Sequence, residues 1–116
     1  MKMRIGGYDR DVRHRGDGLE AVRIRWPPGT RTPKHNHHSG GCVWVLAGRV
    51  FEIQDGRKAY YAEGESFLEV PGGLVHIVGN DSSTDAITFH VYRPELVMEL
   101  FSDSEADLAA LHGTAI

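Results

Sequence analysis

The sequence predicts an all-β fold, a small sandwich or barrel of short strands that ends in a short helix. Short β-rich stretches, about seven or more, recur at regular spacing, and turn residues separate them. The 14 glycines in a chain of 116 residues fit many brief strands joined by turns. No strand alternates with a long helix, which argues against a parallel α/β fold. The length predicts one domain, with a core at about 19–94 and a tail at 95–116.

The strands follow one another in a clear order. Residues 22–26 alternate apolar and basic side chains, which indicates a half-buried strand, and Pro27 ends it. Asp55-Gly56 separates the β-rich stretches 50–54 and 57–61, and this dipeptide is typical of a type I′ hairpin turn. The other expected strands are 42–46, 66–70, 74–78 and 86–92.

The tail differs from the rest of the chain. Residues 95–101 fit either a helix or a strand. Residues 104–111 predict a short helix, because Ser104 is a favourable N-cap and acidic side chains follow it in the first turn.

Composition excludes several classes of protein. Apolar residues make up 41% and charged residues 25%, as in ordinary globular domains, and the net charge of −3 gives no basic surface for nucleic acid. The single cysteine, Cys42, excludes an internal disulfide. No apolar stretch approaches the ~18 residues of a membrane span, and the N-terminus lacks the apolar core of a signal peptide. A cytoplasmic location is therefore expected.

Three of the 7 histidines are candidate metal ligands. His35 and His37 are two positions apart, so on a strand their imidazoles share one face. His76 lies in another expected strand. Two interpretations are open: surface or hydrogen-bonded core histidines, or three imidazoles that form a metal site at the mouth of a barrel.

The residues around these histidines resemble the cupin superfamily. Gly29, His35-x-His37 and Gly48 match its first motif, and Gly64, Pro71-x-Gly73, His76 and Asn80 match its second. The resemblance implies a small, jelly-roll-like antiparallel barrel that holds one divalent metal in its mouth. Most cupins add a glutamate ligand a few residues after the His-x-His pair, but Gly41 and Cys42 occupy that stretch here. A metal set of three histidines is therefore expected, and imidazoles suit Fe, Zn, Ni and Cu.

A second group of polar residues lies in the last expected strand. Thr88, His90 and Tyr92 alternate with Phe89 and Val91, so a hydroxyl, an imidazole and a phenol share one face. This face is either exposed to solvent or a hydrogen-bonded relay near the metal. In the relay, a buried Thr–His–Tyr chain would orient the phenol.

With these residues the sequence resembles the cysteine dioxygenase family, thiol dioxygenases of the cupin fold. The family's late strand, Ser-x-His-x-Tyr before a proline, is matched by residues 88–94, with Thr88 in place of serine. Its Tyr-x-Arg is matched by Tyr8-Asp9-Arg10, and its tryptophan before the histidine pair by Trp26. The resemblance extends over roughly residues 8–96.

This resemblance implies an oxidoreductase that uses Fe(II) and O₂ to convert a small carboxylated thiol, cysteine or a mercapto-acid, to its sulfinate. It implies that Arg10, beside Tyr8, binds the substrate carboxylate. Tyr92, positioned by His90 and Thr88, would donate to bound oxygen or to the carboxylate. The alternatives to Arg10 are Arg13, Arg23, Arg25 and Arg31.

Cys42 has two interpretations. Four residues separate it from His37, and some family members have there a cysteine that forms a thioether with the tyrosine of the late strand. The resemblance thus implies a Cys42–Tyr92 cross-link. The alternative is a thiol that packs as a small apolar side chain.

A second class of function stays open: a small metal-binding cupin that acts as a sensor, a lyase or an isomerase with Zn, Ni or Mn. The expected partners are small molecules, neither nucleic acid nor a membrane. A homodimer is also expected, because pairing would protect exposed edge strands.

Overall fold

The computed structural model describes residues 2–69, 74–94 and 99–113. The strands in chain order are β1 (Arg4–Ile5), β2 (Asp9–Gly16), β3 (Leu19–Trp26), β4 (Thr30–Arg31), β5 (Lys34–His37), β6 (Gly41–Ala47), β7 (Arg49–Gln54), β8 (Arg57–Ala62), β9 (Ser66–Glu69), β10 (Leu74–Asn80), β11 (Ala86–Tyr92) and β12 (Leu100–Phe101). One helix, α1 (Glu105–Leu111), follows them. The predicted all-β fold with a short C-terminal helix is confirmed.

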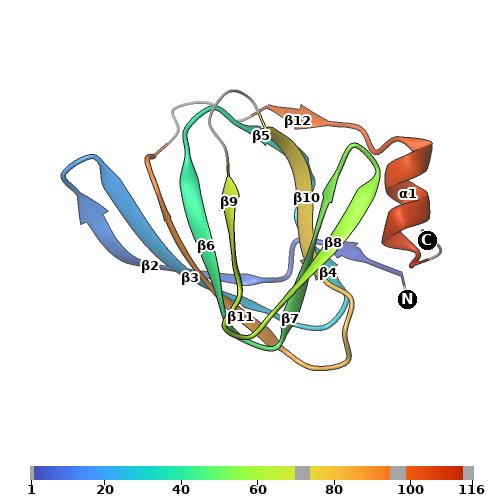
Figure 1. The fold of residues 1–116 in the computed structure, drawn as a ribbon, viewed down its shortest axis with the longest axis horizontal. Helices are drawn as coiled ribbons and strands as arrows, with labels where there is room; N and C mark the ends of the chain where they lie inside the picture. Colours follow the sequence, from blue (N-terminus) through green and yellow to red (C-terminus); the bar gives the residue numbers. More distant parts are fainter. Residues whose placement is uncertain (1, 70–73, 95–98, 114–116) are drawn as a thin grey trace.

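Two curled sheets face each other and enclose the interior (Figure 1). One sheet has five strands in the order β2-β3-β11-β6-β9. The other has the order β1-β4-β10-β5-β12, and the hairpin β7–β8 joins it through β10. Neighbouring strands are antiparallel except β1 and β4. The metal-site strand β5 and the second-motif strand β10 are therefore direct neighbours.

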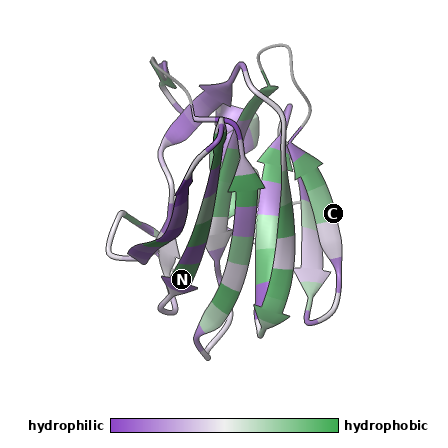
Figure 2. Ribbon diagram, turned by 90° about the vertical axis from the view of Figure 1, so that its left-hand side faces the viewer, coloured by the Kyte–Doolittle hydropathy of each residue, from purple (hydrophilic) through white to green (hydrophobic). Residues whose placement is uncertain are grey.

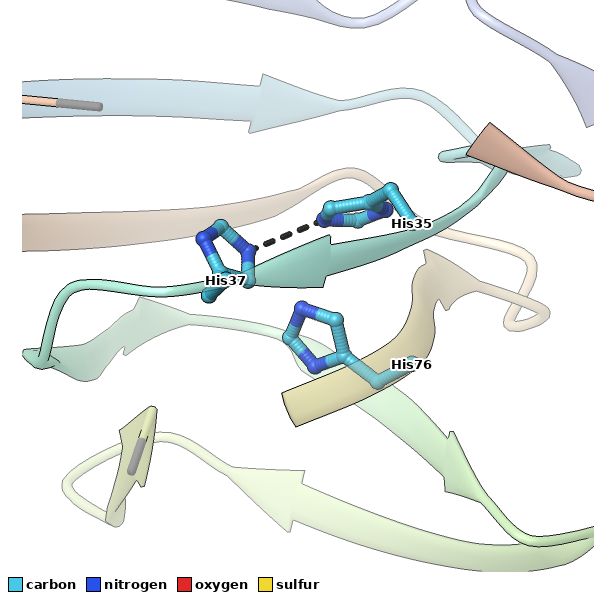
Figure 3. Close-up of side chains that lie close together, drawn as sticks. All are labelled: His35, His37 and His76. Atoms are coloured by element: carbon cyan, nitrogen blue, oxygen red, sulfur yellow. Dashed lines mark hydrogen bonds between the residues drawn. The ribbon is translucent and has the colours of Figure 1, made fainter. Parts of the chain in front are cut away.

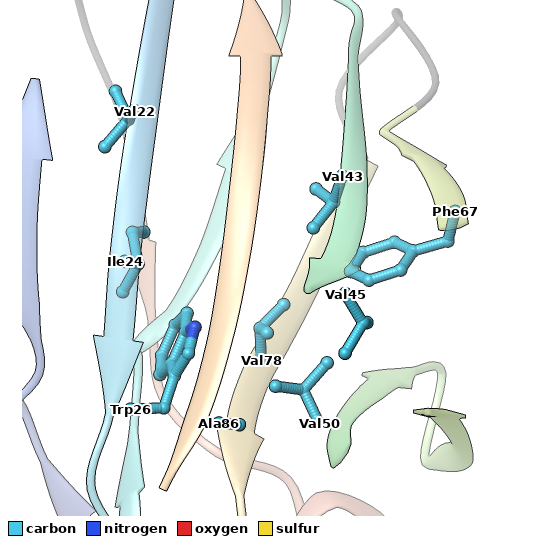
Figure 4. Close-up of a cluster of buried hydrophobic side chains, with 9 residues drawn as sticks. All are labelled: Val22, Ile24, Trp26, Val43, Val45, Val50, Phe67, Val78 and Ala86. Atoms are coloured by element: carbon cyan, nitrogen blue, oxygen red, sulfur yellow. The ribbon is translucent and has the colours of Figure 1, made fainter. Parts of the chain in front are cut away.

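The core lies between the two sheets (Figure 4). Alternate residues of β3, β11 and β6 face it, as the period of two along a strand requires. Trp26, Val22 and Val43 are almost fully buried there. The other members of this cluster are Ile24, Val45, Val50, Phe67, Val78 and Ala86. The strands β3 and β11 also have buried polar residues on the side that faces this core, and these are Glu20, Thr88 and His90.

The helix α1 packs outside the barrel, against β8 and the outer face of β7 and β10. Ala110 and Leu111 are buried against Phe51, Ile53 and Ile77. The predicted N-cap is confirmed: Ser104 Oγ accepts a hydrogen bond from the Asp107 backbone N–H, and the Ser104 backbone N–H donates one to the Asp107 carboxylate.

The hairpin turns contain one confirmed prediction and one missed element. Asp55 and Gly56 have φ angles of 50° and 72°, as a type I′ turn requires. Asp17 and Gly18 form an equivalent turn between β2 and β3. The strand β2 is not predicted, because Val12 is its one large apolar residue and its sequence shows no alternation. The dipeptide Asp17-Gly18 is the sequence signal that indicates a hairpin and therefore β2.

Some predictions fall on residues outside the described parts of the chain. They are Pro71 and Gly73 of the second motif, the end of the strand at 66–70, and residues 95–98 of the ambiguous segment. The described end of that segment, Leu100–Phe101, is a strand that pairs with β5. None of the described helices is long and apolar enough to cross a membrane.

Candidate metal centre

The three predicted ligands meet at one end of the barrel (Figure 3). His35 and His37 are alternate residues of β5, and His76 on β10 is the cross-strand partner of His35. Their ring centroids are 4.7–4.9 Å apart, and the candidate ligand atoms of all three lie within 4.8 Å of one another. His35 Nε2 and His37 Nε2 are 3.0 Å apart. The expected set of three histidines is thus assembled.

Hydrogen bonds orient two of these rings toward a common point. His35 Nδ1 donates to the Pro33 carbonyl at 2.7 Å, and His76 Nδ1 donates to Glu52 Oε2 at 2.7 Å. Each bond occupies Nδ1 and leaves Nε2 as the ring nitrogen that can bind a metal. His76 Nε2 is fully buried and makes no hydrogen bond of good geometry with the described residues, although Glu69 Oε2 lies 3.2 Å away. Three imidazoles whose nitrogens converge within 4.8 Å form a donor set that fits a divalent metal.

A carboxylate that is absent from the sequence prediction lies beside the three rings. Glu69 Oε2 is 2.8 Å from His37 Nε2 and 3.2 Å from His76 Nε2, and the side chain is 8% exposed. Its signal is the alternation of β9, in which Phe67 and Glu69 are buried and Leu68 is exposed. Once the side of Phe67 is known to be the core, Glu69 must point inward as well.

Burial and the two carboxylates set the charge of the rings. Burial would lower the pKa of His76, but Glu52 and Glu69 outweigh it and raise this pKa to about 9. Burial also opposes ionisation of Glu69, whereas its contacts with His37 and His76 hold the pKa of its carboxyl well below the usual range. Burial and the neighbouring His76 lower the pKa of His35 to about 4, so this imidazole is neutral at pH 7.

The polar face of β11 points inward, as one of the two interpretations expected. Thr88 is fully buried and His90 is 8% exposed. Trp26 Nε1 donates to Thr88 Oγ1 at 2.8 Å, and Thr88 Oγ1 is 2.7 Å from His90 Nε2. His90 Nδ1 lies 3.8 Å from Glu69 Oε1. The chain of polar contacts therefore runs from Trp26 to the carboxylate beside the metal site.

Tyr92 is held by different partners from those predicted. Its hydroxyl donates to Glu20 Oε1 at 2.8 Å and accepts from Arg10, so Glu20, rather than His90, fixes the phenol. The reason is the register: Glu20 is the cross-strand partner of Tyr92, whereas the ring of His90 turns toward Thr88. Burial and the bond to Glu20 raise the pKa of Tyr92 to about 12, so the phenol keeps its proton at neutral pH.

Arg10 and Tyr8 lie on the same cavity as the histidines. Arg10 Nη2 is 2.7 Å from Glu20 Oε1, and the ring of Tyr8 packs on Trp26 with centroids 4.6 Å apart. Glu20, which the sequence prediction omits, is 5% exposed and also accepts from Arg15 at 2.8 Å. Its signal is the alternation of β3, which places it on the side of Val22.

The predicted thioether between Cys42 and Tyr92 is contradicted by the pairing of β6 with β11. Tyr92 pairs with Gly41 and faces the cavity, whereas Cys42 pairs with Val91 and Leu68 on the opposite face. Leu68 is 66% exposed, so that face is the outside of the sheet. Adjacent positions on a strand point to opposite faces, which keeps the thiol away from the phenol.

A cavity of about 430 Å³ opens above the histidines. It is lined by His35, His37, His76 and Glu69 at the metal site, by Arg10, Tyr92 and Glu20 on one side, and by apolar residues of the core. This volume suits a small molecule. A ligand in the cavity would meet the candidate metal ligands, a guanidinium and a phenol together.

Comparison with known proteins agrees with this architecture. A structure from Klebsiella pneumoniae, an uncharacterized conserved protein with a double-stranded β-helix domain, matches with a TM-score of 0.72 and 22% identity, over 87% of this chain and 91% of that one. A cupin domain from Bordetella pertussis matches with a TM-score of 0.66 and 22% identity, over 80% and 99%. The cupin domain of an XRE-family transcriptional regulator from Enterobacter cloacae matches with a TM-score of 0.68 and 16% identity, over 78% and 99%.

These structural likenesses concern the fold. The sequence profile of the Cupin domain family matches residues 22–92, which is more than half of the chain. That segment extends from the core strand β3 to the end of β11 and contains all three histidines. The protein therefore belongs to the cupin family.

Proposed function

We propose that this protein is a thiol dioxygenase that uses Fe(II) and O₂ to oxidise a small carboxylated thiol to its sulfinate. One observation carries the proposal: Arg10 and Tyr92 contact each other on the wall of the cavity into which the three histidines point. A cation and a phenol at that place suit a substrate that has a carboxylate at one end and a metal-binding sulfur at the other.

The carboxylate of the substrate would bind to Arg10. Glu20 holds the guanidinium at 2.7 Å and keeps it on the cavity wall. Tyr92, whose proton is retained at neutral pH, would donate a second hydrogen bond to the carboxylate or to an oxygen atom near the metal. Two-point binding of this kind orients a small molecule, because it fixes one end while the other reaches the metal.

The remaining residues would hold the metal and its surroundings. His35, His37 and His76 would bind Fe(II), which when bound supplies the O₂ binding and electron sharing that sulfur oxidation needs. Glu52 would orient His76 through its Nδ1. Both oxygen atoms of O₂ are added to sulfur in such a reaction, so no external reductant is required.

Oxygen consumption by protein loaded anaerobically with Fe(II) tests this proposal. We expect cysteine or 3-mercaptopropionate to cause uptake of one O₂ per sulfinate, measured with an oxygen electrode and mass spectrometry. Cysteamine, which lacks the carboxylate, is the matched control and should react poorly. Arg10→Gln should raise the KM for the carboxylated thiols while the protein keeps its iron. A fully iron-loaded protein that oxidises none of these thiols would refute the proposal.

A second candidate is a cupin that binds Zn, Ni or Mn and acts as a sensor, a lyase or an isomerase. The buried carboxylate of Glu69 beside the histidines favours it, since a mixed nitrogen and oxygen donor set also suits Zn, Ni or Mn. The likeness to the cupin domain of a transcriptional regulator is compatible with a sensor. Stoichiometric Zn after growth in iron-replete medium, with no change in the iron spectrum on addition of thiols, would favour this candidate.

A further inference from the structure

The position of Glu69 relative to the histidines has the geometry of a ligand. Metal ligands at right angles and about 2.1 Å from the ion are about 3 Å apart. Glu69 Oε2 is 2.8 Å from His37 Nε2 and 3.2 Å from His76 Nε2, while His35 Nε2 and His37 Nε2 are 3.0 Å apart. The distances from Glu69 Oε2 to the Nε2 atoms of His37 and His76 are therefore close to the distance between the Nε2 atoms of His35 and His37.

The register of three strands explains why the acid lies on β9. Gly41, the fourth residue after His37, pairs with Tyr92 on one side and with Glu69 on the other. Directly paired residues face the same side of a sheet, so Gly41 and Glu69 both face the cavity. The acid of the first cupin motif, absent from β6, thus has a counterpart one strand away.

Close packing excludes a side chain at the glycine itself. A Cβ at position 41 would lie 2.7 Å from the Cβ of Tyr92 and 3.0 Å from the carbonyl oxygen of Val91. Because both atoms belong to or adjoin the backbone of β11, a glutamate there would force the two strands apart. Tyr92 thus prevents any side chain at position 41, where the first cupin motif usually has its acid. The carboxylate comes instead from Glu69 on the neighbouring strand β9.

We propose that Glu69 is a fourth, carboxylate ligand of the metal bound by His35, His37 and His76. His90 Nδ1, 3.8 Å from Oε1, would orient the carboxylate so that Oε2 points to the ion. A bound carboxylate lowers the net charge of the centre by one and leaves about two open positions in an octahedral site. This proposal concerns the metal alone and does not depend on which reaction the protein catalyses.

Cobalt substitution tests the ligand set without any substrate. The visible d–d bands of Co²⁺ respond to the number and type of ligands, and isothermal titration calorimetry gives the affinity. We expect Glu69→Gln to change these bands and to lower the affinity for Co²⁺ more than about 100-fold. Glu52→Gln is the matched control, since it removes a carboxylate that binds Nδ1 of His76, whereas the metal would bind Nε2. It should lower the affinity less and leave the bands in place.

Two further measurements keep the test decisive. Circular dichroism must show that Glu69→Gln is folded; if it is not, Glu69→Asp replaces it, and its shorter carboxylate should still shift the Co²⁺ bands. A crystal structure of the Zn-loaded protein should place a Glu69 oxygen about 2.0–2.2 Å from the ion. Unchanged cobalt bands in a folded variant, or a carboxylate that lies beyond bonding distance from the ion, would overturn the proposal and leave Glu69 as a hydrogen-bond partner of the rings.

Discussion

Three buried carboxylates determine the chemistry around the cavity at the scale of single residues. Glu52 orients His76, Glu69 contacts two of the candidate ligands, and Glu20 binds Tyr92, Arg10 and Arg15. Buried acids are rare unless they are paired, so each of these contacts compensates the loss of hydration. Their removal should therefore affect the site more than the removal of exposed acids.

The first prediction concerns Glu52. We expect Glu52→Gln to lower the affinity for Zn²⁺ about 10–100-fold, because a neutral amide no longer holds the Nδ1 proton of His76 as strongly. Isothermal titration calorimetry measures the effect, and Glu63→Gln, at an exposed position, is the control. Equal affinities for the two variants would contradict this role of Glu52.

The second prediction is the pH dependence of stability that Glu20 produces. Hydrogen bonds from Tyr92, Arg15 and Arg10 lower the pKa of Glu20 to about 2 from an ordinary value of 4.5. A lowered pKa in the folded state stabilises the protein above the unfolded pKa, and this contribution disappears as the pH falls from about 4.5 toward 2. At pH 7, Glu20→Gln should lower the free energy of unfolding by about 1–3 kcal/mol.

Urea unfolding of the wild type and of Glu20→Gln at several pH values measures this contribution. The difference in the free energy of unfolding should be constant near neutral pH and should shrink below about pH 4.5. Glu63→Gln again serves as the exposed control. A difference that stays the same down to pH 3 would show that the charge of Glu20 does not contribute.

At the scale of elements, alternation explains which strands the sequence predicts. The strands β3, β6 and β11 have apolar residues at every second position, and all three are predicted. The polar edge strand β2 lacks this alternation, and the two-residue strands β1, β4 and β12 are too short to show any period. These strands form because the neighbouring backbone offers hydrogen bonds, which is a tertiary effect.

The third prediction concerns the contact between the hairpin β7–β8 and the helix α1. Gly56 has a φ of 72°, and a Cβ there would lie 2.6 Å from the Cβ of Ala106. Gly64 has a φ of 87° and open space around it, so Gly64→Ala reports the backbone strain alone. We expect Gly56→Ala to lower the free energy of unfolding by about 1–3 kcal/mol more than Gly64→Ala does.

Urea denaturation of both variants checks this difference. The helix signal in circular dichroism should also melt earlier in Gly56→Ala, since the added methyl group pushes against α1. Equal losses of stability in the two variants would indicate that the hairpin and the helix move apart without lowering the free energy of unfolding.

At the scale of the whole molecule, the outer face of the five-stranded sheet has several exposed apolar side chains. The ribbon coloured by hydropathy shows apolar residues on several neighbouring strands of this sheet (Figure 2). On this face Trp44, Leu46 and Leu68 are 42%, 49% and 66% exposed, and β9 is an edge strand. An exposed apolar face that reaches a sheet edge is typical of a surface that binds another protein.

The fourth prediction is that two copies of the chain associate through this face. Sedimentation equilibrium or light scattering should give the mass of a homodimer. Leu46→Lys combined with Leu68→Lys should give a monomer that still binds metal, because both residues lie outside the barrel. Leu108→Lys, on the exposed side of α1, is the control and should leave the dimer intact. A wild type that stays monomeric at high concentration would contradict the prediction.

The strand-rich fold, the helix at Ser104 and the three histidines can be predicted from the sequence, because each depends on residues that are near one another or in a recognisable motif. Other features of the site depend on contacts between strands that are distant in the chain. Glu69 reaches His37 across strands, Glu20 rather than His90 fixes Tyr92, and Cys42 points away from the cavity. These outcomes follow from the register between strands that are distant in the chain, and a shift of one residue would reverse every face. Only the closed barrel establishes that register, since it is the packing of both sheets that selects the inward side of each strand.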